Sequence, residues 1–361
     1  MPKNTLISGF RFGPAWNRDT PEPGPALSCK HESGLDLPAD SRACSRWEER
    51  GGLVLFWRKR PPRLGLALGG GGARGGIHIG VLKVLDEAGI PVSFVAGTSI
   101  GALVGAFYAL SLSGRKLEER LNSYLSSDTF RRARFNLMAQ ADGLKDAPLF
   151  SRIASFIKKE FLLAMALTRP HLIPREQFLE NLAYFLPDVR MEGTRIPFAA
   201  TATDLETGEA VLIKEGSLRD AVYASCTYPG VVEAVRFGGR LLVDGGVVAM
   251  VPVEAVKSLG ADLVLAVNVE KCIGEDVEGL SGIEVLFRAD DIMAAELTRI
   301  QTQKADILIH PGVGNIKWYD FQRMPQYVAV GEKAAREKLP EIRKALGLER
   351  IPRRTKRPGP H

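Results

Sequence analysis

Two glycine-rich turns lie close together in this chain, and a short apolar stretch precedes each of them. The first turn, Gly69–Gly75, reads GGGGARG and follows the apolar stretch 64–68. The second turn, Gly97–Gly101, reads GTSIG and follows 93–96. Short apolar runs that end in glycine are typical of buried strands, and a helical pattern follows each turn. The pair therefore predicts two strand–turn–helix units, with bare backbone N–H groups and a serine at the turns.

Strand and helix patterns go on alternating after these units, which indicates an α/β layered sheet that is largely parallel. The first two predicted helices cover 75–88 and 99–111. Further strands are predicted at 197–203, 209–213, 240–244, 262–268 and 306–309, and further helices at 217–225, 252–259, 283–303 and 326–346.

The two ends of the chain differ from its middle in composition and charge. Residues 1–61 are rich in Pro, Gly, Ser and charged residues, which predicts a disordered or loosely packed leader before a folded domain at 62–346. Residues 347–361 form a basic, Pro-rich tail that we also expect to be disordered. Residues 1–63 and 349–361 each carry a net charge of +4, against +6 for the whole chain. The body is therefore slightly acidic, which argues against nucleic acid as a partner.

Cysteine and histidine usage favours a reduced, cytoplasmic location and predicts no metal site. The four cysteines are widely spaced, without a C-x-x-C pair, and no two His or Cys residues show the spacing of metal ligands. The N-terminus does not have the pattern of a secretory signal. The apolar stretch 94–110 contains several glycines and is shorter than a membrane span.

The first turn has two nucleotide-binding interpretations, and neither fits. Residues 70–75 satisfy G-x-G-x-x-G, but a dinucleotide site also needs an acid after the second strand, where this chain has 96–99, AGTS. A Walker loop needs a Gly-Lys-Ser/Thr sequence, which is absent here. Four consecutive glycines carry an entropic cost that is hard to justify for a plain turn. The turn is therefore interpreted as an anion or oxyanion cradle, without a cofactor.

The second turn matches the G-x-S-x-G pattern of a nucleophile elbow, with Ser99 between a strand and a helix. The pentapeptide alone is weakly specific, and a helix N-cap is the simpler role for this serine. Its context, after an apolar strand and beside a second glycine turn, favours a nucleophile.

Ser99 needs a base, and two interpretations remain open. Asp244 ends the predicted strand 240–244 and precedes two glycines, where an acid faces the ligand-binding edge of an α/β sheet. His310 ends the last strand and would complete a Ser–Asp–His triad of the α/β-hydrolase type. Asp142 lies in a polar loop and is interpreted as a turn residue. His78, on the first predicted helix, is expected to be a packed helical histidine.

Four blocks make the sequence similar to the patatin-like phospholipases, specifically to their compact bacterial branch. The blocks are GGGARG at 70–75, GTSIG at 97–101, ASCTYPG at 224–230 and DGG at 244–246. The resemblance extends over about 62–346 and implies a three-layer α/β/α fold with a largely parallel central sheet. One departure is Ala249-Met250, where relatives often carry Asn; we expect this pair to lie away from the catalytic residues.

The resemblance implies a lipid acyl hydrolase that works through a Ser–Asp dyad without histidine. Ser99 would be the nucleophile and Asp244 the base. The oxyanion hole would come from the turn's glycines, with the arginine fixing the turn or meeting a phosphate; these residues are Gly70, Gly71, Gly72 and Arg74. The implied substrate is a phospholipid or lysophospholipid. A regulatory protein that keeps the fold with little turnover is the non-enzymatic alternative.

Three segments point toward lipid without defining a site. The predicted helical stretch 146–185 carries apolar residues suited to a lid, an acyl-binding wall or plain core. Residues 52–57, GLVLFW, precede a basic cluster and fit either a linker or a membrane-surface contact. The basic ends would steer the chain to anionic membranes.

Overall fold

The computed structural model describes residues 60–133, 171–271, 273, 282–313 and 318–348. They belong to one compact unit, Lys59–His361. At its centre lies β1 (Leu64–Leu68), which pairs in parallel with β2 (Val92–Thr98) on one side and β7 (Leu263–Val267) on the other. All five residues of β1 are buried, as expected for a strand covered on both faces.

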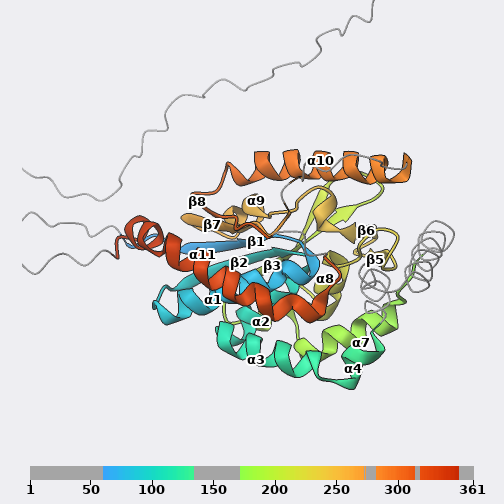
Figure 1. Ribbon diagram of the computed structural model, residues 1–361, viewed down its shortest axis with the longest axis horizontal. Helices are drawn as coiled ribbons and strands as arrows, with labels where there is room; N and C mark the ends of the chain where they lie inside the picture. The colour runs from blue at the N-terminus through green and yellow to red at the C-terminus, as the bar shows by residue number, and fades with distance from the viewer. Residues whose placement is uncertain (1–59, 134–170, 272, 274–281, 314–317, 349–361) are drawn as a thin grey trace, which may run out of the picture. The chain divides into compact units, whose positions relative to one another are not determined.

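The remaining strands extend this centre into an eight-stranded sheet (Figure 1). The hydrogen-bonded order is β5-β6-β3-β2-β1-β7-β8, and β4 pairs with β3 off this path. The added strands are β3 (Phe198–Asp204), β4 (Ala210–Ile213), β5 (Val235–Phe237), β6 (Arg240–Asp244) and β8 (Ile307–Ile309). Strands β3, β2, β1, β7 and β8 run parallel, whereas β4, β5 and β6 pair antiparallel. The predicted largely parallel sheet is confirmed.

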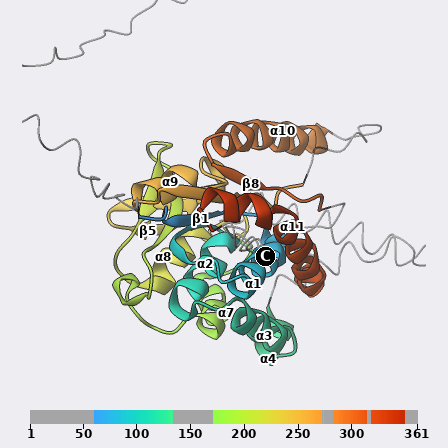
Figure 2. The same cartoon turned by 90° about the vertical axis from the view of Figure 1, so that its left-hand side faces the viewer.

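Helices cover both faces of the sheet, which confirms the three layers (Figures 1 and 2). One face carries α1 (Gly76–Glu87), α2 (Ile100–Ser111), α3 (Gly114–Leu125), α4 (Asp128–Arg132), α7 (Arg175–Phe185), α8 (Leu218–Ser225) and α11 (Met324–Ala345). The other face carries α9 (Val253–Ser258) and α10 (Gly282–Thr302). Short 3-10 helices lie at Gly72–Gly75, Met191–Gly193, Gly245–Val247 and Phe321–Arg323.

Strand alternation makes the two cores unequal. Leucines 64, 66 and 68 of β1 belong to the larger core, whereas Ala67 belongs to a smaller core of alanines and valines that includes Val256 of α9. The small residues let α9 approach closely, since a Cβ at Gly65 would lie 2.2 Å from Val256 Cγ1. The sheet therefore has a thick, bulky side and a thin side.

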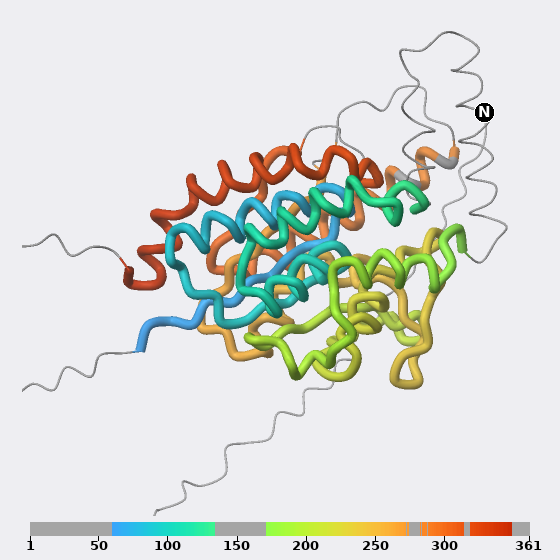
Figure 3. Tube along the Cα trace, turned by 90° about the horizontal axis from the view of Figure 1, so that it is seen from below, coloured from blue at the N-terminus to red at the C-terminus, as the bar shows by residue number. Residues whose placement is uncertain are grey.

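Glycines bring the first and last helices into backbone contact. A Cβ at Gly80 of α1 would lie 2.1 Å from the Val328 carbonyl oxygen, and one at Gly331 of α11 would lie 2.1 Å from that of Ile77. Figure 3 shows α11 running alongside α1. The C-terminal helix is thus fixed against the helix that follows the first glycine turn.

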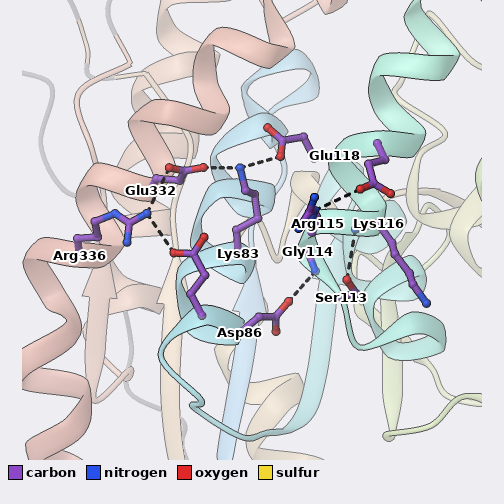
Figure 4. Close-up of polar contacts among 11 residues, drawn as sticks. Lys83, Asp86, Ser113, Gly114, Arg115, Lys116, Glu118, Glu332 and Arg336 are labelled. Atoms are coloured by element: carbon purple, nitrogen blue, oxygen red, sulfur yellow. Dashed lines mark hydrogen bonds and ion pairs between the residues drawn. The ribbon is translucent and has the colours of Figure 1, made fainter.

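A polar cluster joins α1 to α3 and α11 (Figure 4). Lys83 forms ion pairs with Glu118 and Glu332, at 2.7 and 2.5 Å. Asp86 accepts hydrogen bonds from the Gly114 N–H and the Tyr108 hydroxyl, both at 2.7 Å. Both oxygens of this half-buried carboxylate are satisfied, and one of them caps the start of α3.

Most predicted elements agree with the structure within a few residues, but three were missed: α3, α4 and β5. Helix α3 did carry a signal, because Leu117, Leu121 and Tyr124 recur at helical spacing and are buried. The predictions for 1–59, for the 146–170 part of the helical stretch and for 349–361 lie outside the described residues. None of the helices in the described ranges combines the length and apolarity needed to cross a membrane.

Candidate active site

Ser99 occupies a strained turn between β2 and α2. Its φ of 55° and ψ of −123° lie where residues other than glycine rarely occur, at a cost of roughly 1–3 kcal/mol. Glycines make this turn possible, since a Cβ at Gly97 would lie 2.2 Å from the Gly101 carbonyl oxygen. The side chain is half-buried at the start of a helix. This geometry matches the elbow expected from G-x-S-x-G.

Asp244 brings a buried carboxylate to the end of β6. Its side chain is 3% exposed, and Oδ1 accepts a 2.7 Å hydrogen bond from the Gly246 N–H. Burial raises the pKa of Asp244 from 3.8 to about 6, although the nearby Ser99 hydroxyl and the Gly246 N–H hold it down. From the residues that the structure describes, no hydrogen bond of ordinary geometry reaches the buried Oδ2. The carboxylate thus lies beside Ser99 with one oxygen unpartnered.

The segment Ser225–Thr227 joins these two residues. The Ser99 N–H donates to Ser225 Oγ at 2.9 Å, and the Asp244 N–H donates to the Thr227 carbonyl oxygen at 3.0 Å. Sequence reasoning used this block only as part of a resemblance and assigned it no role. The sequence feature that could have indicated a role is the run of Ser, Cys and Thr at the end of a helix.

Cys226, in the middle of this segment, stays neutral. Burial and the negative charge of Asp244 raise the pKa of the thiol well above its usual value, although the Ser99 side chain beside it lowers it. Cys226 is a free thiol. The charge next to Ser99 therefore comes from Asp244 and not from a thiolate.

Four consecutive backbone N–H groups form the first turn, and two of them are already hydrogen-bonded within the protein. Gly69 and Gly70 donate to the carbonyl oxygens of Val267 and Met250, both at 3.0 Å. The N–H groups of Gly71 and Gly72 have no acceptor within the described part of the chain. Gly72 adopts a φ of 57°, and a Cβ there would lie 2.2 Å from the Trp318 carbonyl oxygen, so only glycine fits.

Met250 places the first turn against both catalytic candidates. A Cβ at Gly70 would lie 2.8 Å from Met250 Sδ and 3.5 Å from the Ser99 Cβ. A Cβ at Gly246 would lie 3.0 Å from Met250 Cε. The expectation that Ala249-Met250 lies away from the dyad is therefore wrong. The chain turns sharply after Asp244, and this brings Met250 back between Gly70 and Gly246.

Arg74 and His78 hold the turn from within the protein. Arg74 is 9% exposed, and its Nε donates to the Gly71 carbonyl oxygen at 3.1 Å. Burial lowers the pKa of Arg74, and nearby Glu270 raises it. His78 is fully buried, with Nε2 at 2.8 Å from the Gly69 carbonyl oxygen, and burial lowers its pKa to about 4. His78 is therefore a neutral, packed histidine, as predicted, and donates to the turn.

His310 does not join Ser99. It follows β8, which lies three strands from β2, or roughly 14 Å at the usual strand spacing. Its exposed ring lies 3.3 Å from the Glu270 carbonyl oxygen. The Ser–Asp–His interpretation requires His310 next to Ser99, and the strand order does not place it there. Asp142 lies outside the described residues.

Two aromatic residues flank the first turn. Tyr228 and Trp318 place their ring centroids 5.1 Å apart, and the Trp318 carbonyl oxygen accepts the Ala73 N–H at 2.6 Å. Tyr228 is 46% exposed. Sequence reasoning did not find Trp318, because it lies far along the chain from the turn.

In the ranges that the structure covers, no group of His, Cys, Asp or Glu has the arrangement of a metal site.

The family model described as patatin-like phospholipase matches residues 66–257, more than half of the chain. The chain belongs to the patatin-like phospholipase family. Patatin-like phospholipase domain-containing protein 6 of Mus musculus is 28% identical over 295 residues, which cover 74% of this chain and 20% of that protein.

Two further proteins show more local or more distant similarity. An uncharacterized NTE family protein of Mycobacterium bovis is 32% identical over 210 residues, which cover 57% of this chain and 49% of that protein. The crystal structure of VipD from Legionella pneumophila has a TM-score of 0.44 at 16% identity, covering 79% of this chain and 67% of that one. This chain spans a fifth of the mouse relative and about half of the mycobacterial one.

Proposed function

We propose that the protein hydrolyses lipid acyl esters through a dyad of Ser99 and Asp244. The observation that carries this proposal is a buried carboxylate with an unpartnered oxygen beside a serine in a strained elbow. A pKa of about 6 lets Asp244 be ionised at neutral pH and still accept a proton, as a general base must. Family membership supports the same chemistry.

In the first half-reaction, Ser99 Oγ attacks the ester carbonyl carbon while its proton passes to Asp244. The carbonyl oxygen becomes an oxyanion, which the N–H groups of Gly71 and Gly72 are free to bind. We assign Gly70 to placing the turn, since its own N–H is bonded to Met250. The tetrahedral intermediate then collapses, the bond to the alcohol breaks, and Asp244 returns the proton to the leaving oxygen.

In the second half-reaction, water releases the acyl group from Ser99. Asp244 takes a proton from the water, and the hydroxide attacks the acyl-enzyme carbonyl at the same oxyanion site. Collapse frees a fatty acid, and the proton goes back to Ser99 Oγ. Each oxyanion-hole donor contributes about 2.7–4 kcal/mol in other hydrolases, so two donors carry much of the expected catalysis.

The proposed substrate is a phospholipid or a lysophospholipid, as the name of the family indicates. The exposed ring of Tyr228 and the neighbouring Trp318 offer an apolar wall for an acyl chain. A cytoplasmic location with peripheral contact to anionic lipid goes with this proposal, and the free thiol of Cys226 fits a reducing compartment.

Hydrolysis of a short-chain p-nitrophenyl ester by Ser99→Ala tests the proposal. Loss of the nucleophile is expected to reduce turnover to the uncatalysed level. Ser258→Ala is the matched control, because Ser258 is exposed on α9 and its hydroxyl donates to the Ala255 carbonyl oxygen within its own helix. Turnover retained by Ser99→Ala would refute the assignment.

A further inference from the structure

Helix α10 presents five large apolar side chains to solvent. Leu286 and Met293 are 66% and 65% exposed, the highest values among the large apolar residues of the described ranges. Val285, Ile292 and Ile300 are exposed as well. These residues recur at intervals of seven or eight, or about two helical turns, so they share one face. We call these five residues the outer face of α10.

Some polar side chains of α10 lie against the protein. Thr298 and Thr302 are 1% and 7% exposed, and Asp291 pairs with Lys271 at 2.6 Å. Gln301 Nε2 donates to the Val248 carbonyl oxygen at 2.6 Å. A surface helix of a globular protein ordinarily buries its apolar stripe and exposes its polar one. Helix α10 instead exposes five large apolar side chains beside its charged ones, so its outer face fits an apolar environment.

The same helix borders the proposed active site. Val248, which Gln301 holds, lies in the turn that follows Asp244. Asp291 lines a small cavity of about 50 Å³ together with Arg74 of the first glycine turn and Glu270. Figures 1 and 2 show α10 as the outermost element on its side of the sheet. Helix α10 therefore contacts both the turn after Asp244 and the surroundings of the first glycine turn.

We infer that the outer face of α10 docks on a lipid surface and presents the active site to it. This inference rests on the proposed function, which requires a substrate that is held in lipid aggregates. A second copy of the chain fits less well. A 21-residue helix is about 31 Å long and 10 Å wide, so it offers roughly 300 Å². Stable protein interfaces bury about 800 Å² on each partner.

The charge of α10 selects the kind of lipid. The helix carries four acidic residues and two arginines, for a net charge of −2, and no basic cluster. Glu296 and Arg299 pair with each other at 2.6 Å. Attachment therefore depends on apolar insertion at the headgroup boundary and does not require anionic lipid. Zwitterionic phosphatidylcholine is the lipid that this face fits.

Co-sedimentation with phosphatidylcholine vesicles tests the inference. The protein carries Ser99→Ala so that vesicles stay intact, and the buffer holds about 0.5 M salt to screen the basic ends. The test variant adds Leu286→Gln and Met293→Gln, which change two exposed side chains. The control adds Leu112→Gln and Leu348→Gln instead. These leucines are 39% and 43% exposed and follow the C-termini of α2 and α11, away from Ser99.

The test variant is expected to lose at least about tenfold in vesicle partitioning, while the control binds like the parent. With Ser99 restored, the test variant should hydrolyse a soluble short-chain ester at the parental rate, which separates docking from catalysis. Equal sedimentation of the test variant and its parent would overturn the inference. A parent that runs as a dimer in gel filtration, and becomes a monomer in the test variant, would overturn it in favour of a second copy.

Discussion

Two polar clusters lie near the two ends of helix α1, and their carboxylates differ in how fully they are hydrogen-bonded. Asp86, near its C-terminal end, accepts one hydrogen bond on each oxygen, and Lys83 beside it is held by two glutamates. Asp244, near the turn that leads into α1, has one satisfied oxygen and one buried oxygen without a partner. The first cluster joins helices, whereas the second leaves a buried carboxylate beside a serine.

Burial raises the pKa of both carboxylates. Burial raises the pKa of Asp86, and the bonds from Gly114 and Tyr108 lower it. Burial raises the pKa of Asp244 to about 6, and the Ser99 side chain and the Gly246 N–H lower it. Buried polar groups that serve stability are normally satisfied, so an exception beside a strained serine indicates function. If the two clusters divide stability and catalysis between them, a variant of each should impair one property and leave the other unimpaired.

Asp244→Asn should separate the two properties most strongly. Without a base, kcat for an ester is expected to fall by about 10³-fold or more. The folded protein should become more stable above pH 6, because a pKa raised from 3.8 to about 6 means that the buried charge costs up to about 3 kcal/mol there. Folded Asp244 binds its proton more readily than the unfolded form, so this gain should shrink as the pH falls from about 6 to 3.8.

Urea unfolding and ester kinetics at several pH values measure both effects. A variant that keeps its activity would remove Asp244 from the mechanism, and one that loses stability at pH 8 would show that the carboxylate is structural.

Lys83→Met should have the opposite effect to Asp244→Asn: it should lower stability and leave catalysis unchanged. It leaves Glu118 and Glu332 without their shared cation, with side chains only 29% and 25% exposed. We expect a loss of about 1–3 kcal/mol in the free energy of unfolding, with kcat/KM for a soluble ester unchanged. Lys116→Met, on the exposed face of α3, is the control and should change neither quantity. A selective loss of activity in Lys83→Met would contradict the division of stability and catalysis between the two clusters.

The pH dependence of kcat/KM should follow the Asp244 carboxylate. Asp244 must be ionised to accept the Ser99 proton, so kcat/KM is expected to fall about tenfold per pH unit below pH 6 and to level off above it. Steady-state kinetics with an uncharged ester between about pH 4.5 and 8 gives the profile. An apparent pKa near 4 would mean that the carboxylate is not desolvated in solution.

His310→Ala should have the smallest effect. The exposed ring contacts the Glu270 carbonyl oxygen and lies three strands from β2. We expect activity within about twofold of the parent. A loss as large as that of Asp244→Asn would restore the triad and contradict the topology.

The strand–turn–helix units and the serine elbow could be predicted because local rules determine them. Glycines 97 and 101 must be small at a tight turn, and the apolar stretches before the turns can only be buried strands. The base was predictable in part, since Asp244 stands at the end of a strand and before two glycines. The choice between a dyad and a triad was open, because it depends on strand order, which the sequence pattern does not contain.

The partners that tune the site could not be predicted for the same reason. Ser225 reaches Ser99 across 126 positions, and Trp318 reaches the first turn from near the end of the chain. Met250 was misjudged because closeness in sequence to Asp244 did not reveal the sharp turn that brings it back to Gly70. The exposure of the apolar residues of α10 could not be predicted either, since an apolar stripe at helical spacing is ordinarily buried.

Labelling with a fluorophosphonate tests the central claim most directly, because the probe reports an activated serine without requiring the natural substrate. We predict covalent modification at Ser99, a rate that rises as the pH passes about 6, loss of labelling in Asp244→Asn and normal labelling in His310→Ala. Peptide mass spectrometry locates the adduct. Labelling that persists in Asp244→Asn, or disappears in His310→Ala, would contradict a serine activated by Asp244 alone.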